Sequence, residues 1–280
     1  MTIISASRRT DLPAFHAPWF MARIREGFFT RVNPYNRRQT SMVSLAPDEV
    51  AAIVFWSKNP RPLFPYLDEL DSRGFRYYFH FTLNPYDSIF EPGLPPLEDR
   101  IAAFHELTGR VGGRRVIWRY DPIIVSTVTP VEWHLERAGA LAASLEGATE
   151  RLVISFLDRY GTVGRRLERL RQGRGIDCGD LTAPERGHDQ ERLAAGLHAA
   201  AAARGMGMFT CAEEVDLAGL GIGRGSCVDA GLIRELWGVG GTFTRDRNQR
   251  PFCRCAVSVD MGAYDSCGYD CLYCYARRGR

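Results

Sequence analysis

The sequence has no apolar run long enough to span a bilayer, and its 280 residues carry a formal net charge of only +3. Residues 1–9 lack the charged start, long apolar stretch and cleavage site of a signal peptide. A charge this close to zero also gives little support for nucleic acid as the main partner. We therefore expect a cytoplasmic protein with no membrane partner.

Common catalytic patterns are missing as well. Each of the six histidines stands alone in its stretch, so none forms a pair with the spacing of a metal site. The glycine-rich stretch 219–225 lacks the lysine of a phosphate-binding P-loop, and no Ser-His-Asp order is recognisable. Candidate chemistry must therefore come from another residue type.

Cysteine is that residue type, and its distribution is uneven. Seven of the eight cysteines lie after residue 210, whereas a secreted disulfide scaffold would be shorter and would spread its cysteines along the chain. In a reducing compartment, thiols clustered in this way indicate metal ligands or redox groups. Cys178 stands alone in a loop rich in glycine and aspartate and matches no pattern.

Apolar runs rich in β-branched and aromatic residues predict six strands, and helical patterns fill the gaps between them. The predicted strands cover residues 3–7, 52–56, 76–83, 115–120, 151–156 and 207–211. Helices are expected over 14–27 and 190–204, and a capping box at Thr129–Glu132 opens another that ends at Gly147. A longer insertion, residues 28–45, is expected to form a hairpin or a covering loop.

This alternation of strands and helices predicts an α/β fold, either a (β/α) barrel or a doubly wound sheet. We expect the barrel, a partial one of six units resembling a TIM barrel, over residues 1–240. A cysteine-rich extension, residues 241–280, is expected to pack on its rim.

Polar residues follow several predicted strands where a proline ends the ladder, in the steps Lys58-Asn59-Pro60, Asn84-Pro85 and Asp121-Pro122. The carboxyl ends of parallel strands form the edge at which α/β proteins carry function, although such steps are also simple turn formers. We expect four candidate catalytic side chains in the mouth of the barrel, namely Lys58, Arg119, Asp121 and Glu213. Arg8 and Arg9 have the donors to grip a carboxylate or phosphate, unless they form a salt bridge with Asp11 or Glu213.

The end of the chain carries the most specific pattern. Cys267, Cys271 and Cys274 place three thiols within eight residues, and thiolates are the preferred ligands of iron–sulfur clusters. Three thiolates on a [4Fe–4S] cluster leave the fourth iron open to another ligand. Zinc is the alternative, because a structural zinc site could borrow Cys253 or Cys255 as its fourth ligand.

Cys-x3-Cys-x2-Cys with an aromatic residue before the last cysteine resembles the signature of the radical S-adenosylmethionine superfamily, and the stretch Cys271–Ala276 is similar to its spore photoproduct lyase-like members. The resemblance implies an enzyme with a [4Fe–4S] cluster that cleaves S-adenosylmethionine reductively to a 5′-deoxyadenosyl radical. It also implies a small-molecule substrate and a reductant such as a ferredoxin or flavodoxin. The candidate residues for binding the cofactor are Arg8, Arg9, Asn84 and Tyr273.

The whole chain also resembles DUF1848, an uncharacterised bacterial family. The shared stretches are Ser7–Phe15, Phe55–Pro60, Phe81–Tyr86, Trp118–Pro122, Cys211–Glu213, Asp246–Arg250 and the cysteine tail. In the radical superfamily the cysteine motif normally follows the first strand, whereas here it ends the chain. A tail that folds back over the strand rim would deliver the cluster to the same place.

Four further cysteines lie between the last predicted strand and the tail. Cys211, Cys227, Cys253 and Cys255 come from three segments, and together they have the ligands for a second cluster or for one zinc ion. The alternative is that they are small buried apolar residues.

Three functions remain open from the sequence. The first is a radical enzyme with one or two [4Fe–4S] clusters and S-adenosylmethionine. The second is an iron–sulfur protein that is non-catalytic or transfers electrons. The third is a zinc-stabilised protein that binds nucleic acid through Arg8, Arg9 and the basic tip, residues 277–280.

Overall fold

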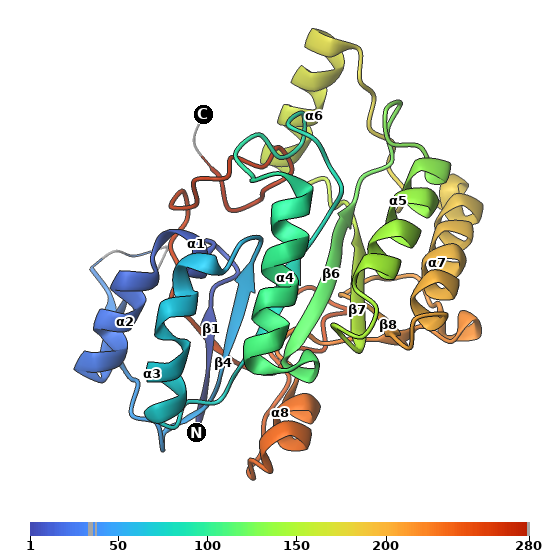
Figure 1. Cartoon of the computed structure of the whole chain (residues 1–280). Helices are drawn as coiled ribbons and strands as arrows, with labels where there is room; N and C mark the ends of the chain where they lie inside the picture. Colours follow the sequence, from blue (N-terminus) through green and yellow to red (C-terminus); the bar gives the residue numbers. More distant parts are fainter. Residues whose placement is uncertain (33–35, 37, 279–280) are drawn as a thin grey trace.

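The computed structural model describes residues 1–32, 36 and 38–278, and it confirms the predicted α/β class. Within these residues, a sheet of eight strands runs through the molecule, and all of its neighbouring strands are parallel (Figure 1). In spatial order the strands are β10 (Val259–Asp260), β1 (Thr2–Ala6), β4 (Val50–Ser57), β5 (Tyr77–Thr82), β6 (Val116–Ile123), β7 (Arg151–Phe156), β8 (Gly207–Thr210) and β9 (Gly223–Arg224). The six strands predicted from the sequence are β1 and β4 to β8.

The sheet is open, so a closed barrel is not formed. The strand order is that of a barrel opened between its last two strands, because β10 lies beside β1 while β9 forms the opposite edge. Eight strand–helix units close a TIM barrel, whereas in the described residues only six strands of this sheet are longer than two residues. The order from β1 to β9 does not reverse at a switch point, so the alternative of a doubly wound sheet is wrong.

The connections carry eight α-helices in the described residues. They are α1 (Leu12–Phe15), α2 (Ala17–Glu26), α3 (Leu67–Ser72), α4 (Leu97–Val111), α5 (Val131–Ser144), α6 (Gly161–Arg174), α7 (Gly187–Ala202) and α8 (Ala230–Trp237). Helix α2 ends at Gly27, whose φ of 79° is a left-handed conformation that glycine adopts without steric cost. None of the helices in the described part of the chain has the length and apolar character to cross a membrane.

The capping box at the start of α5 is not formed. The helix has Pro130 at its N-cap position and no capping bond from a side chain. The Thr129 hydroxyl instead donates to the Ile124 carbonyl at 2.6 Å, in the loop before the helix. The sequence therefore predicted the position of the helix start, but not how its backbone groups are satisfied.

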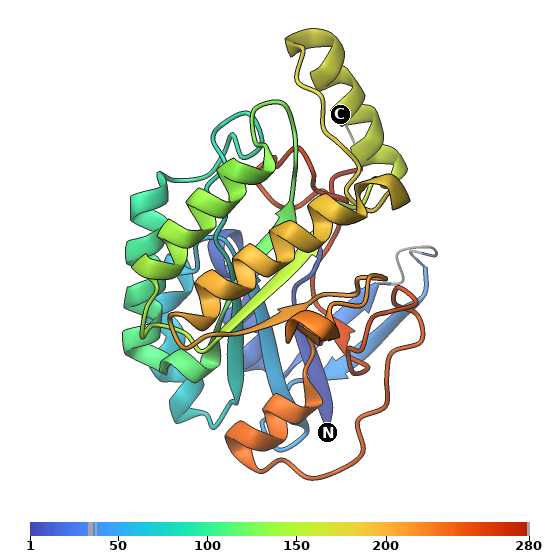
Figure 2. The same cartoon turned by 90° about the vertical axis from the view of Figure 1, so that its right-hand side faces the viewer.

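The two faces of the sheet are covered by different parts of the chain. Residues such as Phe55, Phe79 and Trp118 pack in one core with the helices of the strand–helix units. Their strand neighbours Val54 and Tyr78 point the other way, as alternation along a strand requires, and join a second core. That second core includes α8 and the segments that carry the four cysteines between residues 211 and 255. Figure 2 shows the helices of the first layer on one side of the sheet and the orange to red segment on the other.

The insertion after α2 forms an antiparallel hairpin, β2 (Phe28–Val32) and β3 (Thr40–Ser44), which is one of the two forms expected from the sequence. Residues 33–35 and 37 of this insertion, and residues 279–280 of the basic tip, lie outside the described residues.

Candidate functional site

The carboxyl edge of the sheet and the C-terminal tail enclose a cavity of about 380 Å³. The tail, red in Figure 1, lies over this edge of the strands. All seven cysteines that follow residue 210 line the cavity: Cys211, Cys227, Cys253, Cys255, Cys267, Cys271 and Cys274. The clustering of thiols in the sequence is therefore also a clustering in space.

The terminal thiols are close enough to influence one another electrostatically. Burial raises the pKa of Cys271 to about 12; Lys58 opposes this shift, while Glu91, Cys274 and Cys267 add to it. Burial likewise raises the pKa of Cys267 to about 11. These two thiols are therefore neutral at neutral pH, and they would release protons on binding a metal cation.

Arg166 of α6 fixes the backbone of the cysteine loop. Its guanidinium donates to the carbonyl oxygens of Leu272 at 2.7 Å, Cys274 at 2.7 Å and Arg277 at 2.8 Å, with a longer contact to Cys271 at 3.4 Å. A guanidinium offers five donors in a fixed plane, which suits it to hold several carbonyls of one loop. The loop is therefore anchored to a helix of the scaffold.

A second anchor joins the tail to the loop after β5. The Gly93 amide donates to the Tyr269 carbonyl at 3.2 Å, and the Leu272 amide donates to the Phe90 carbonyl at 2.9 Å. A Cβ on residue 93 would lie only 2.8 Å from the Tyr269 oxygen, so the close approach of the two backbones requires glycine.

A buried network of charges connects the tail to the strand edge. Lys58 Nζ donates to Glu91 Oε1 at 2.7 Å and to the Tyr273 hydroxyl at 2.8 Å, and that hydroxyl donates to the same carboxylate. Arg100 pairs with the other oxygen of Glu91 at 3.3 Å. The Glu91 side chain is fully buried, so two cations compensate its charge in place of water.

Asn84 links this network to the next strand. Its amide nitrogen donates to the Asp121 carbonyl at 2.9 Å and to the Tyr273 hydroxyl at 3.4 Å, and its oxygen accepts from the Asp121 amide at 2.9 Å. Asn84 and Asp121, which each precede a proline in the predicted polar steps, thus hydrogen-bond to each other between β5 and β6.

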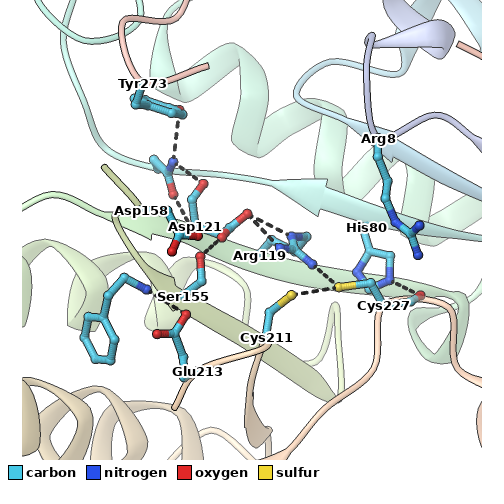
Figure 3. Close-up of polar contacts among 12 residues, drawn as sticks. Arg8, His80, Arg119, Asp121, Ser155, Asp158, Cys211, Glu213, Cys227 and Tyr273 are labelled. Atoms are coloured by element: carbon cyan, nitrogen blue, oxygen red, sulfur yellow. Dashed lines mark hydrogen bonds and ion pairs between the residues drawn. The ribbon is translucent and has the colours of Figure 1, made fainter. Parts of the chain in front are cut away.

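Arg119 and Asp121 form an ion pair in the middle of the cavity wall. Arg119 Nη2 lies 2.7 Å from Asp121 Oδ2, and Nη1 donates to the sulfur of Cys227 at 2.7 Å. Ser155 donates to the other oxygen of Asp121 (Figure 3). Arg119 therefore connects the Asp121 carboxylate with Cys227, one of the four cysteines that precede the tail.

Glu213 is held beside this wall by the amide of Phe156, which donates to its carboxylate at 3.2 Å. Burial raises the pKa of Glu213 to about 8, and Arg250 opposes the shift. Lys58, Arg119 and Asp121 line the cavity. Asn84 and Glu213 are not lining residues, but each hydrogen-bonds to a residue that lines it, Asn84 to Asp121 and Glu213 to Phe156.

Arg8 and Arg9 line the cavity without an ion pair to Asp11 or Glu213 in the described residues. The Arg8 guanidinium lies 5.4 Å from the centre of the Trp56 ring, and its Nη2 is buried with no hydrogen-bond partner among the described residues. Asp11 instead accepts from the Ser57 hydroxyl and the Lys58 amide, both at 2.7 Å, and burial raises its pKa to about 6. Arg8 therefore keeps a free donor for an anion.

Sequence reasoning missed four residues that organise the site. They are Glu91, Arg100, Arg166 and Asp260. Asp260 accepts from the hydroxyls of Ser5 and Ser7 and from the Arg8 amide, and so fixes β10 beside β1. A composition signal was available for Glu91 only indirectly: its partner Lys58 is the only lysine in the chain.

The cysteines fit a single metal ion and a [4Fe–4S] cluster differently. In the part of the chain that the structure describes, no three or more His, Cys, Asp or Glu side chains converge on a point where a single ion could bind. A [4Fe–4S] cluster places each thiolate on a different iron, so it does not require one such point. The three terminal thiols, gathered on one cavity and close enough to interact, have the donor chemistry for a cluster of this kind.

Comparisons with known proteins give a family and no function. No curated protein and no solved structure matches the chain. The model of one family, described as a domain of unknown function, DUF1848, matches residues 3–276, which include the cavity wall and all seven clustered cysteines. The chain therefore belongs to the DUF1848 family.

Proposed function

We propose that the chain is an iron–sulfur enzyme of the radical S-adenosylmethionine type, acting on a small molecule in a partial (β/α) barrel. The observation that carries the proposal is that Cys267, Cys271 and Cys274 line the same cavity as the charged residues at the carboxyl ends of the strands. A [4Fe–4S] cluster on these thiols would supply one electron to S-adenosylmethionine and so release a 5′-deoxyadenosyl radical. We place this chemistry in the cytoplasm, where thiols stay reduced and a ferredoxin or flavodoxin can supply the electron.

The chain's own residues suit three tasks in such a reaction. Arg8, with its free buried donor, and Arg9 are suited to hold the carboxylate of the cofactor. Lys58 and Tyr273 keep the cysteine loop aligned with the sheet through Glu91. Trp56 gives the cavity an apolar wall, and a dry cavity protects a radical from side reactions.

The tail position of the motif is compatible with this proposal. In a superfamily member with the usual order, the cluster sits at the carboxyl edge after the first strand. Here β10 lies directly beside β1, and the Asp260 carboxylate bonds to the Arg8 amide at 3.0 Å. The cysteine loop that follows β10 therefore starts from the place where the first strand ends.

The test is anaerobic turnover. The full chain is reconstituted with iron and sulfide, mixed with S-adenosylmethionine and dithionite, and assayed for 5′-deoxyadenosine. We expect the parent and Cys178→Ala to form 5′-deoxyadenosine, because Cys178 lies outside the cavity. Cys271→Ala should form none, because it removes one of the three proposed cluster ligands. A bound cluster without 5′-deoxyadenosine would favour the electron-transfer alternative, and equal amounts from all three proteins would contradict the assigned site.

A further inference from the structure

The second thiol set consists of Cys211, Cys227, Cys253 and Cys255, which lie near one another. The proposed radical chemistry does not use them. The sulfurs of Cys211 and Cys227 are 3.1 Å apart. The sulfur of Cys255 accepts from the amides of Cys227 at 3.2 Å and Val228 at 3.4 Å, and the sulfur of Cys253 accepts from the Cys255 amide at 3.5 Å. Thiols from three segments of the chain thus lie close together, and two of them, Cys253 and Cys255, accept hydrogen bonds from backbone amides.

The surroundings of these sulfurs are built for negative charge. Amide groups that donate to sulfur are most effective when the sulfur is a thiolate, because a neutral thiol is a weak acceptor. Arg119 Nη1 donates to the Cys227 sulfur at 2.7 Å. The Arg8 guanidinium, whose Nη2 has no hydrogen-bond partner among the described residues, interacts electrostatically with Cys227 and Cys255. Four thiolates around a divalent cation carry a net charge of −2. Arg8 supplies one positive charge next to them, and Arg119, whose charge is already paired with Asp121, supplies a hydrogen-bond donor to Cys227.

The spacing of the sulfurs selects among the groups that four thiolates can hold. A disulfide needs a sulfur–sulfur bond of about 2.05 Å, so Cys211 and Cys227 are not bonded. Zinc–sulfur bonds of about 2.3 Å in a tetrahedron place the sulfurs about 3.8 Å apart. A cubane puts its thiolates on separate irons and would spread them much further. The observed 3.1 Å is closest to the single-ion arrangement.

We propose that Cys211, Cys227, Cys253 and Cys255 form a separate site for one thiophilic divalent cation of the zinc class. In the described residues these sulfurs do not yet converge on a common point. Because the Cys211–Cys227 contact is shorter than a tetrahedral edge, the two sulfurs have to move apart around the ion, and rotation about χ1 of cysteine allows this. The bound ion would tie the loop after β8, the start of α8 and the segment before β10 to the inner face of the sheet.

The experiment uses the full chain with the three terminal cysteines replaced, so that its outcome is independent of the proposed radical enzyme. The variant Cys267→Ala/Cys271→Ala/Cys274→Ala is purified anaerobically and titrated with Co²⁺. We expect the visible absorption of tetrahedral cobalt thiolate with one cobalt per chain, and its loss on adding zinc. Adding Cys253→Ser/Cys255→Ser should abolish the absorption, whereas adding Cys178→Ala should leave it unchanged.

A second measurement does not depend on the folding of the quintuple variant. The triple variant is alkylated with and without Zn²⁺ and then mapped by mass spectrometry. We expect zinc to protect Cys211, Cys227, Cys253 and Cys255 at least tenfold, with no change at Cys178. Three results would overturn the proposal: no metal-dependent protection, a Cys211–Cys227 disulfide in anaerobically purified protein, or an iron–sulfur chromophore on these four thiols after reconstitution.

Discussion

At Lys58 the chain uses the only lysine among its 36 lysine and arginine residues. Lysine is a compact point charge, whereas the guanidinium of arginine is wide and planar. The compact ammonium of Lys58 contacts both the Glu91 carboxylate and the Tyr273 hydroxyl, which lie 2.7 and 2.8 Å from Nζ. The residue type is therefore matched to this network.

The Glu91 carboxylate is expected to stabilise the folded protein because it compensates two cations. Glu91→Gln leaves Lys58 and Arg100 with uncompensated charge in a buried setting, and we expect a loss of about 3–5 kcal/mol in the free energy of unfolding. Urea-induced unfolding measures it. The double variant Lys58→Met/Glu91→Gln should lose less than the sum of the single variants. Strict additivity would show that the two side chains do not interact.

Arg166 gives a second test at the scale of one residue. Arg166→Met removes the donors that hold the carbonyls of Leu272, Cys274 and Arg277. We expect amide hydrogen exchange in residues 271–277 to become at least tenfold faster, while the strands of the sheet keep their protection. Arg169→Met, an exposed position on the same helix, is the matched control. Equal exchange in both variants would remove Arg166 from the role of anchor.

The thiols and several strand-end polar residues were predictable because each carries a local signal. Cysteine spacing is visible within eight residues, and the proline after Asn84 follows the end of β5. The prediction that a strand ends at Asp121-Pro122 is wrong, because β6 continues to Ile123, with a shift in its register to β7 between Tyr120 and Ile123. Glu91 and Arg166 carry no such signal. Glu91 lies in a loop, and Arg166 belongs to an arginine-rich helix whose four other arginines, at 165, 169, 171 and 174, are exposed. Only the folded chain shows which arginine meets the tail.

At the scale of elements, the six long strands were predicted well because each is an apolar run with a polar end. The two-residue strands β9 and β10 have no periodicity that a sequence can reveal, and β10 is fixed by the long-range contact of Asp260 with Ser5 and Ser7. The capping box failed for a local reason, because the Thr129 hydroxyl donates to the Ile124 carbonyl in the preceding loop.

Helix α5 carries a buried histidine that makes stability depend on pH. His134 lies 2.7 Å from the Tyr120 hydroxyl and 2.9 Å from the Ile124 carbonyl, and burial lowers its pKa to about 4. The unfolded chain binds a proton near pH 6.5, so between pH 6.5 and 4 the unfolded state holds more protons than the folded state. This group therefore lowers the free energy of unfolding as pH falls through that window, by at most about 1.4 kcal/mol per pH unit.

His134→Phe tests this coupling by the slope and not by the level of stability. The variant loses two hydrogen bonds and should be less stable at pH 7. Its free energy of unfolding should nevertheless fall less steeply between pH 6.5 and 4 than that of the parent, as measured by urea denaturation at each pH. Parallel pH profiles for the two proteins would show that His134 stays uncharged in both states or charges equally in both.

At the scale of the whole molecule, the last strand, β10, lies beside the first strand, β1. The sheet opens between β9 and β10. The segment that follows β8 covers the face of the sheet that carries Val54 and Tyr78, and the tail then reaches the carboxyl edge beside β1. A sequence predicts units and their order, but whether six strands close depends on how the last segment packs. This packing brings all seven clustered cysteines onto one cavity.

The most direct test of the terminal cluster is the electron paramagnetic resonance spectrum of the reconstituted, dithionite-reduced chain with and without S-adenosylmethionine. We predict the signal of a reduced [4Fe–4S] cluster that shifts when S-adenosylmethionine is added, in the parent and in Cys178→Ala, and is lost in Cys271→Ala. The contradicting result is a parent protein that holds no cluster, or one whose cluster signal is the same with and without S-adenosylmethionine.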